Sequence, residues 1–154
     1  MEFRDLKAQY QRYKNEIDNA IQKVLTNADF IGGNEVKILE ERLATYVGVK
    51  HCITCANGTE AMSLVLMAWD IEEGDAVFVP DFTFFSTGEV VSFRGATPVF
   101  VDVNRDTFNI DTAKLEKVIQ RTIKEGKLTP KAIIPVDLFG LPADHHEIDR
   151  IAKE

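Results

Sequence analysis

The stretch that decides the fold is residues 73–87, which read EGDAVFVPDFTFFST. Its centre, residues 76–79, is a short apolar run that ends at Pro80. A run of this length next to a turn-forming residue is typical of a buried strand. Three phenylalanines follow Pro80 and lead into a segment, at about 84–93, that is predicted to be helical. The stretch is therefore interpreted as a strand, a loop and a helix.

The same alternation of short apolar runs and helical segments extends outward from this stretch. Strands are predicted at 51–56, 76–79, 97–103 and 132–136, and helices at about 59–69, 84–93, 112–120 and from 144 onward. Strict alternation implies βαβ units with right-handed crossovers, which give an α/β fold with a mostly parallel sheet and flanking helices. Residues 121–131 are the most loop-like connection, because they are polar and contain Gly126 and Pro130.

Two helices are predicted before the first strand. Apolar residues spaced three and four apart form one face over residues 5–25, and a second helix is expected at about 34–46. The chain is therefore divided into a helical segment, 1–50, and an α/β domain, 51–154. The last helix carries apolar residues that are expected to need a following strand, so the chain is interpreted as cut short. These residues are Ile148, Ile151 and Ala152.

Composition excludes several classes of protein. The chain has 154 residues, 45% of them hydrophobic and 28% charged, which is ordinary for one soluble domain with a core. A net charge of -7 disfavours nucleic acid as a partner, since phosphate backbones need a basic surface. No apolar run approaches the roughly 18 residues that a membrane span needs, and residues 1–10 lack the apolar core of a signal peptide. A cytoplasmic protein that binds no membrane is expected.

Metal and redox chemistry are not expected from the cysteines and histidines. Cys52 and Cys55 form a C-x-x-C pair, but no second pair follows at zinc spacing, and both are expected to be small buried residues. The histidines at positions 51, 145 and 146 show no ligand spacing, which favours surface or cap roles.

Ligands of open α/β sheets bind beyond the carboxyl ends of the strands, which points to the loops 57–59, 80–83 and 137–140. In the first loop, Gly58 lets a ligand approach the backbone, and the free amides of Thr59 and Glu60 with the Thr59 hydroxyl form an anion site. The alternative is an Asn-Gly turn with a Thr cap and no ligand. In the second loop, one of three phenylalanines could cover a flat heteroaromatic ligand, or all three could be core.

Six segments in register give the sequence a family resemblance. They are 30–36, 56–62, 73–80, 82–87, 95–102 and 132–140. Together they resemble the DegT/DnrJ/EryC1/StrS family of sugar aminotransferases, which depend on pyridoxal 5'-phosphate (PLP). The start, Phe3-Arg4-Asp5-Leu6-Lys7, is similar to the branch that aminates UDP-linked 3-keto sugars, including 3-keto uronic acids.

The resemblance implies the amino-terminal part of the fold-type-I (aspartate-aminotransferase-like) large domain, working as a homodimer. It implies that Gly58, Thr59 and the amide of Glu60 bind the PLP phosphate and that Phe84 stacks on the pyridine ring. In the family, the Schiff-base lysine and the aspartate that pairs with the pyridine nitrogen come later than Glu154, so no catalytic residue is expected here. Asp137 stands where many relatives have His.

For the complete enzyme, the resemblance implies transfer of an amino group from glutamate to a nucleotide-linked keto sugar. Residues 1–154 alone are predicted to be inactive. Two alternatives stay open. One is a PLP-dependent sugar dehydratase of the same family, in which His replaces the lysine. The other is a non-catalytic truncated fragment that only dimerises or binds phosphate weakly.

Overall fold

The computed structural model describes residues 4–154, so Phe3 of the amino-terminal match lies outside the described residues. The chain divides into two compact units, residues 1–54 and residues 55–154. The functional division predicted after residue 50 stays a prediction.

The first unit contains two helices, α1 (Leu6–Asn27) and α2 (Asn34–Val47). The carboxylate of Asp5 accepts a hydrogen bond from the amide of Ala8 at 2.8 Å and so caps the start of α1. An ion pair of 2.7 Å between Lys23 and Glu35 joins the two helices. The apolar face predicted for α1 is present but exposed, since this helix has no buried residue.

The strand predicted at 51–56 is wrong, because these residues form neither helix nor strand. Instead, the carboxylate of Glu40 accepts hydrogen bonds from the amide and the hydroxyl of Thr54, at 2.9 and 2.8 Å. The Thr54 amide, which would pair with a neighbouring strand in a sheet, is therefore bound by the Glu40 side chain of α2.

The second unit is built on a parallel three-stranded sheet with the order β2-β1-β3. Its strands are β1 (Asp75–Pro80), β2 (Thr97–Val101) and β3 (Thr129–Ile133). Central β1 is buried along its whole length, as expected for a strand that is covered on both faces. Val79 pairs with Phe100 of β2, and Phe78 pairs with Ile133 of β3. The predicted strands at 76–79, 97–103 and 132–136 are thus present with shifted ends.

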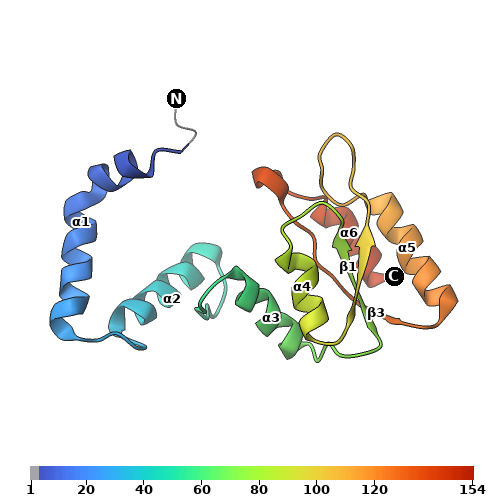
Figure 1. The fold of residues 1–154 in the computed structure, drawn as a ribbon, viewed down its shortest axis with the longest axis horizontal. Coiled ribbons are helices and arrows are strands. Elements are labelled where there is room, and N and C mark those ends of the chain that lie inside the picture. The colour runs from blue at the N-terminus through green and yellow to red at the C-terminus, as the bar shows by residue number, and fades with distance from the viewer. Residues whose placement is uncertain (1–3) are drawn as a thin grey trace. The chain divides into compact units, whose positions relative to one another are not determined.

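Four helices cover the sheet: α3 (Gly58–Ala68), α4 (Ser86–Phe93), α5 (Thr112–Glu125) and α6 (His145–Lys153). Successive residues of β1 point to opposite faces. Phe78 packs in one core cluster with Leu115 of α5 and Ile148 of α6, whereas Val77 and Val79 pack in the other with residues of α3 and α4. Figure 1 shows these two layers on either side of the strands. The predicted α/β class with a parallel sheet is confirmed.

One expectation for the carboxyl-terminal third is wrong. The connection 121–131 is not mainly a loop, because α5 continues to Glu125 and ends at Gly126, whose left-handed φ of 64° suits glycine. Ile148 and Ile151 are each only 7% exposed and pack in the cluster with Leu115, so α6 packs part of its apolar face against α5 and the sheet. Ala152 is exposed, and all three residues line an open groove beside β3, so the need for a following strand stays a prediction.

Candidate functional site

The starts of α3 and α4 lie at the same edge of the sheet, the one where β1 ends. The short connections 69–74 and 81–85 make both helices run antiparallel to β1, and the two helices pack side by side (Figure 1). Ligands of open α/β sheets bind at this carboxyl edge. The predicted phosphate-binding residues at the start of α3 and the aromatic loop before α4 therefore belong to one region.

Helix α3 begins at Gly58, and its cap is Asn57 rather than Thr59. The Asn57 side-chain oxygen accepts a hydrogen bond from the Glu60 amide at 2.9 Å. The Glu60 amide is thus not free, contrary to the sequence-based expectation. The amides of Gly58 and Thr59 have no partner among residues 4–154. Apart from the adjoining residues and the backbone of α3, no atom of the described chain lies within 4 Å of where a Cβ on Gly58 would be, so this helix start is open.

The aromatic loop before α4 presents its phenyl rings to solvent. Phe84 is 75% exposed and Phe85 is 76% exposed, so the alternative that all three phenylalanines are core is wrong. The hydroxyl oxygens of Thr83 and Thr87 lie 3.0 Å apart and form a hydrogen bond across the loop. Thr87 is buried, so this bond ties the residue before Phe84 to the fixed body of α4.

The third loop follows β3 and contains a short 3-10 turn, η1 (Leu138–Gly140). The Asp137 carboxylate before it accepts a hydrogen bond from the Ala143 amide at 2.9 Å and contacts His145 Nε2 at 2.8 Å. The pKa of Asp137 is lowered, mainly by the hydrogen bond from the Ala143 amide and to a smaller extent by the contact with His145. Phe139 has a left-handed φ of 55° and is 86% exposed. Sequence reasoning selected this loop but not Phe139.

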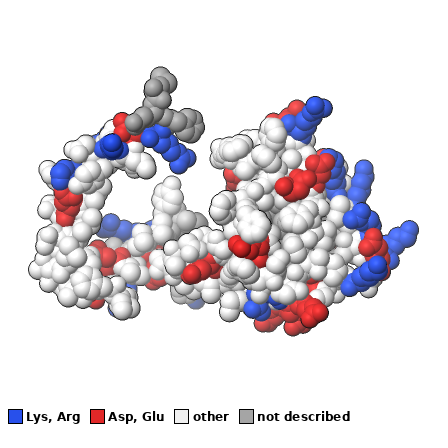
Figure 2. All heavy atoms as spheres, viewed as in Figure 1, with Lys and Arg blue, Asp and Glu red and all other residues white. Residues whose placement is uncertain are grey.

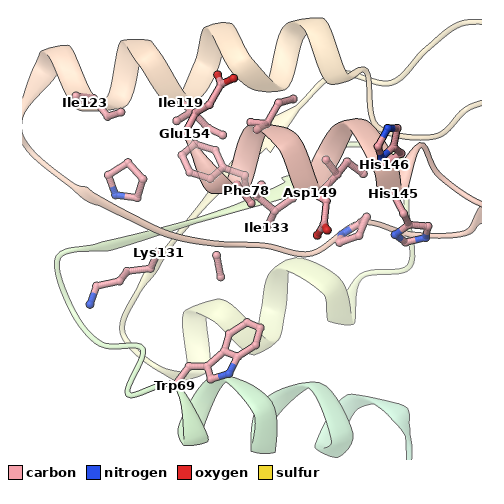
Figure 3. A pocket seen from close by; sticks show the side chains of 16 residues that line it. Trp69, Phe78, Ile119, Ile123, Lys131, Ile133, His145, His146, Asp149 and Glu154 are labelled. Atoms are coloured by element: carbon pink, nitrogen blue, oxygen red, sulfur yellow. The ribbon is translucent and has the colours of Figure 1, made fainter. Parts of the chain in front are cut away.

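A groove of about 780 Å³ lies elsewhere in this unit, along β3. Figure 3 shows Trp69, at the end of α3, on one side of the groove, with Ile119 and Ile123 of α5 across from it. Neither Thr59 nor Phe84 lines it. The groove is mostly apolar and does not include the predicted site.

The cysteines and the other potential metal ligands among residues 4–154 form no metal-binding group. Cys52 is half-buried and Cys55 is exposed, so the expectation of two buried cysteines is wrong. In the described part of the chain no group of three or more His, Cys, Asp and Glu residues could hold a metal ion. Figure 2 shows acidic and basic side chains interspersed on the visible face. None of the helices described is long and apolar enough to cross a membrane.

The family model described as the DegT/DnrJ/EryC1/StrS aminotransferase family matches residues 11–154. The chain therefore belongs to this aminotransferase family.

Two curated relatives illustrate the likeness in sequence. The chain is 47% identical to UDP-2-acetamido-2-deoxy-3-oxo-D-glucuronate aminotransferase of Pseudomonas aeruginosa, with 100% of the chain and 41% of the relative covered. It is 44% identical to UDP-N-acetyl-3-dehydro-alpha-D-glucosamine 3-aminotransferase of Acidithiobacillus ferrooxidans, with 97% and 39% covered. The chain thus spans about two fifths of the length of these relatives.

Solved structures show the same likeness in fold. The crystal structure of a DegT DnrJ EryC1 StrS aminotransferase from Brucella abortus is 52% identical, with a TM-score of 0.97 over 99% of this chain and 41% of that chain. Streptomyces venezuelae DesV is 33% identical, with a TM-score of 0.87 over 99% of this chain and 39% of that chain. The second unit is accordingly part of a fold-type-I domain, as predicted.

Proposed function

We propose that this chain supplies the phosphate-binding and ring-covering part of the PLP site in a nucleotide-sugar aminotransferase. The observation that carries the proposal is that two features lie at the same edge of the sheet, where β1 ends. One is the open start of α3 at Gly58, and the other is the exposed ring of Phe84. Membership of an aminotransferase family supports the same assignment.

The start of α3 has the donors that a phosphate group needs. The amides of Gly58 and Thr59 have no partner among residues 4–154, and the positive end of the helix macrodipole favours an anion there. The Thr59 hydroxyl is a further donor on a half-buried residue. The Glu60 amide joins the site only if the Asn57 side chain turns away from it. These residues fit a phosphate monoester.

The exposed ring of Phe84 is suited to stacking on a flat ligand. A phenyl ring that is 75% exposed gains apolar contact when a flat heteroaromatic ring stacks on it, and an offset stack contributes about 0.5–1.5 kcal/mol beyond burial. The hydrogen bond between Thr83 and Thr87 restricts the loop that carries this ring. Phe84 therefore covers the pyridine ring while the start of α3 binds the phosphate.

Bound PLP supplies an electron sink for amino-group transfer. The residues of this chain bind and orient that group, and the lysine that attaches to it is expected beyond Glu154. Residues 1–154 alone are consequently inactive. The test mixes the 154-residue chain with PLP and glutamate and monitors the half-reaction by the absorbance of the cofactor. A measurable half-reaction would contradict the predicted inactivity.

The proposed acceptor is a UDP-linked 3-keto sugar, with glutamate as the amino donor. Its support is the name of the 47% identical relative, which acts on a UDP-linked 3-oxo-glucuronate. We further propose a cytoplasmic homodimer. The exposed apolar side chains of α1, among them Leu6, Ile21 and Leu25, support self-association, because large exposed apolar patches mark interaction surfaces.

A chimera tests the proposed function. Residues 1–154 replace the matching segment of the Pseudomonas aeruginosa relative, and release of 2-oxoglutarate from glutamate is measured with the UDP-linked 3-keto sugar present. The chimera is expected to bind PLP and to transaminate, because the replaced segment carries the same site. A folded chimera that binds no PLP would overturn the proposal.

Two threonine variants of the chimera locate the phosphate site. Thr59→Val removes the hydroxyl donor and is expected to weaken PLP binding roughly tenfold to a hundredfold, the value of a hydrogen bond to a charged group. Thr129→Val makes the same change at the exposed start of β3 and is expected to leave binding unchanged. Equal affinities for the two variants would remove Thr59 from the site.

A further inference from the structure

Asn109 is a buried polar residue that forms hydrogen bonds to the turn η1, which is distant in the sequence. Its side chain is 5% exposed and makes two hydrogen bonds with η1 and the residue after it. The amide nitrogen donates to the Leu141 carbonyl at 2.9 Å, and the amide oxygen accepts from the Leu138 amide at 3.1 Å. The Asn109 side chain thus pairs with the backbone donor at the start of the turn and with the backbone acceptor after its end.

The residue before Asn109 contacts the aromatic loop. The ring of Phe108 lies 5.6 Å from the ring of Phe82, centroid to centroid, at an angle of 46°. Phe108 has a left-handed φ of 59°. Two backbone bonds to Asn104 hold this conformation: the Phe108 amide donates to the Asn104 carbonyl, and the Asn104 amide donates to the Asn109 carbonyl, each at 2.8 Å. Residues 104–109 therefore touch both other loops of the site region.

The turn that Asn109 clasps is held in a conformation that its sequence does not favour. Phe139 has a φ of 55°, a strained conformation for a non-glycine residue that persists only where the surrounding structure fixes it. The two hydrogen bonds of Asn109 are such surroundings. The Phe139 ring is 86% exposed. Its turn follows β3 as the loop of Phe84 follows β1, so both lie beyond the carboxyl ends of parallel strands.

We propose that Asn109 is a positioning residue that holds the Phe139 turn and, through Phe108 and Phe82, the loop of Phe84 in one arrangement around the ligand. This inference rests on the proposed function, because the ligand is the PLP assigned there. Asn109 itself touches neither the phosphate-binding helix start nor Phe84, so it acts through the loops.

The test uses the 154-residue chain labelled with 4-fluorophenylalanine. The fluorine resonances of Phe82 and Phe139 are assigned by single Phe→Leu substitutions. Asn109→Leu keeps the number and branching of the side-chain heavy atoms but removes both hydrogen bonds, and it is expected to shift both resonances without any ligand. Thr122→Val is the matched control, since it also removes a buried hydrogen bond, from Thr122 to the Val118 carbonyl, at a site within α5. It is expected to shift neither resonance.

A pH-dependent rescue separates positioning from general loss of stability. In Asn109→Asp, a protonated carboxyl can accept from the Leu138 amide and donate to the Leu141 carbonyl, as the native amide does. Burial raises the pKa of such a carboxyl, so the fluorine spectrum is expected to approach that of the native chain at pH 5 and to depart from it at pH 8. The native chain is recorded at both pH values for reference. A spectrum of this variant that does not respond to pH would overturn the proposal.

Titration with PLP completes the experiment. Asn109→Leu is expected to bind PLP roughly threefold to tenfold more weakly than Thr122→Val, the equivalent of one hydrogen bond. If the native chain binds PLP and the two variants bind it equally, the inference fails. If no form of the 154-residue chain binds PLP, the fluorine shifts of Phe82 and Phe139 decide whether Asn109 couples the two loops, and the proposed function is decided separately by the chimera.

Discussion

Asn57 and Glu60 are joined by a hydrogen bond of 2.9 Å from the Glu60 amide to the Asn57 side-chain oxygen. The candidate phosphate site is therefore partly capped by its own chain. A bound phosphate would share the helix start with this cap, because the cap leaves the amides of Gly58 and Thr59 available and occupies that of Glu60.

Substitutions of Asn57 are expected to separate capping from phosphate binding. Asn57→Ala removes the cap and is expected to lower the free energy of unfolding by about 1 kcal/mol, measured by urea denaturation. It also frees the Glu60 amide, so PLP binding is expected to be retained. Asn57→Asp keeps the cap but places a negative charge beside the phosphate, so stability is retained and binding weakens. Binding that weakens equally in both variants would contradict the assignment of this site.

The bond between Thr83 and Thr87 is expected to stabilise the aromatic loop. Thr87→Val removes a hydroxyl from a residue that is 4% exposed and leaves its partner unpaired, which costs about 1 kcal/mol of unfolding free energy. Thr83→Val breaks the same bond. The double variant is expected to lose less than the sum of the two single losses, because one interaction connects the pair. Additive losses in urea denaturation would show that the hydroxyl pair contributes nothing.

The sequence allowed the parallel sheet to be predicted because its strands differ locally from their surroundings. Residues 76–79 are continuously apolar and end at Pro80, and every residue of β1 is buried. Residues 51–56 look similar in composition but form no strand. Whether such a run joins a sheet depends on a partner strand, and Thr54 is held by the Glu40 carboxylate. The local sequence pattern does not indicate that the Glu40 carboxylate competes with a partner strand for the Thr54 amide.

The candidate site was predictable only in part, for the same reason. The rule that ligands bind beyond strand ends points to the loops of Gly58, Thr59 and the three phenylalanines, although the strand expected before Gly58 does not form. The choice of Phe84 among the three comes from the family resemblance. The side chain of Asn109 bonds to Leu138 and Leu141, which follow it by 29 and 32 positions in the chain. Only the order of the strands brings them together, and sequence reasoning therefore missed Asn109. The cap at Asn57 could have been found, since asparagine is a preferred N-cap residue.

The Asp137 carboxylate is expected to add an acid-sensitive contribution to stability. The Ala143 amide and His145 lower its pKa below the ordinary value of 3.8. A lowered pKa gives stability that is complete above about pH 4 and is lost as the pH falls through the folded-state value. Asp137→Asn removes this titration. The difference in unfolding free energy between native chain and variant should therefore shrink between pH 5 and pH 2, and a constant difference would contradict the prediction.

Phe84 and Phe85 allow a matched test of which ring covers the ligand, since they are neighbours with exposed fractions of 75% and 76%. Substituting either by leucine removes an exposed ring, so neither variant is expected to lose more than about 0.5 kcal/mol of unfolding free energy. PLP binding, followed by the absorbance of the cofactor, is expected to weaken roughly twofold to tenfold in Phe84→Leu, because stacking is lost there. Phe85→Leu is expected to bind as the native chain does. If Phe85→Leu is the weaker binder, the ring that covers the cofactor is Phe85, and the assignment of Phe84 is wrong.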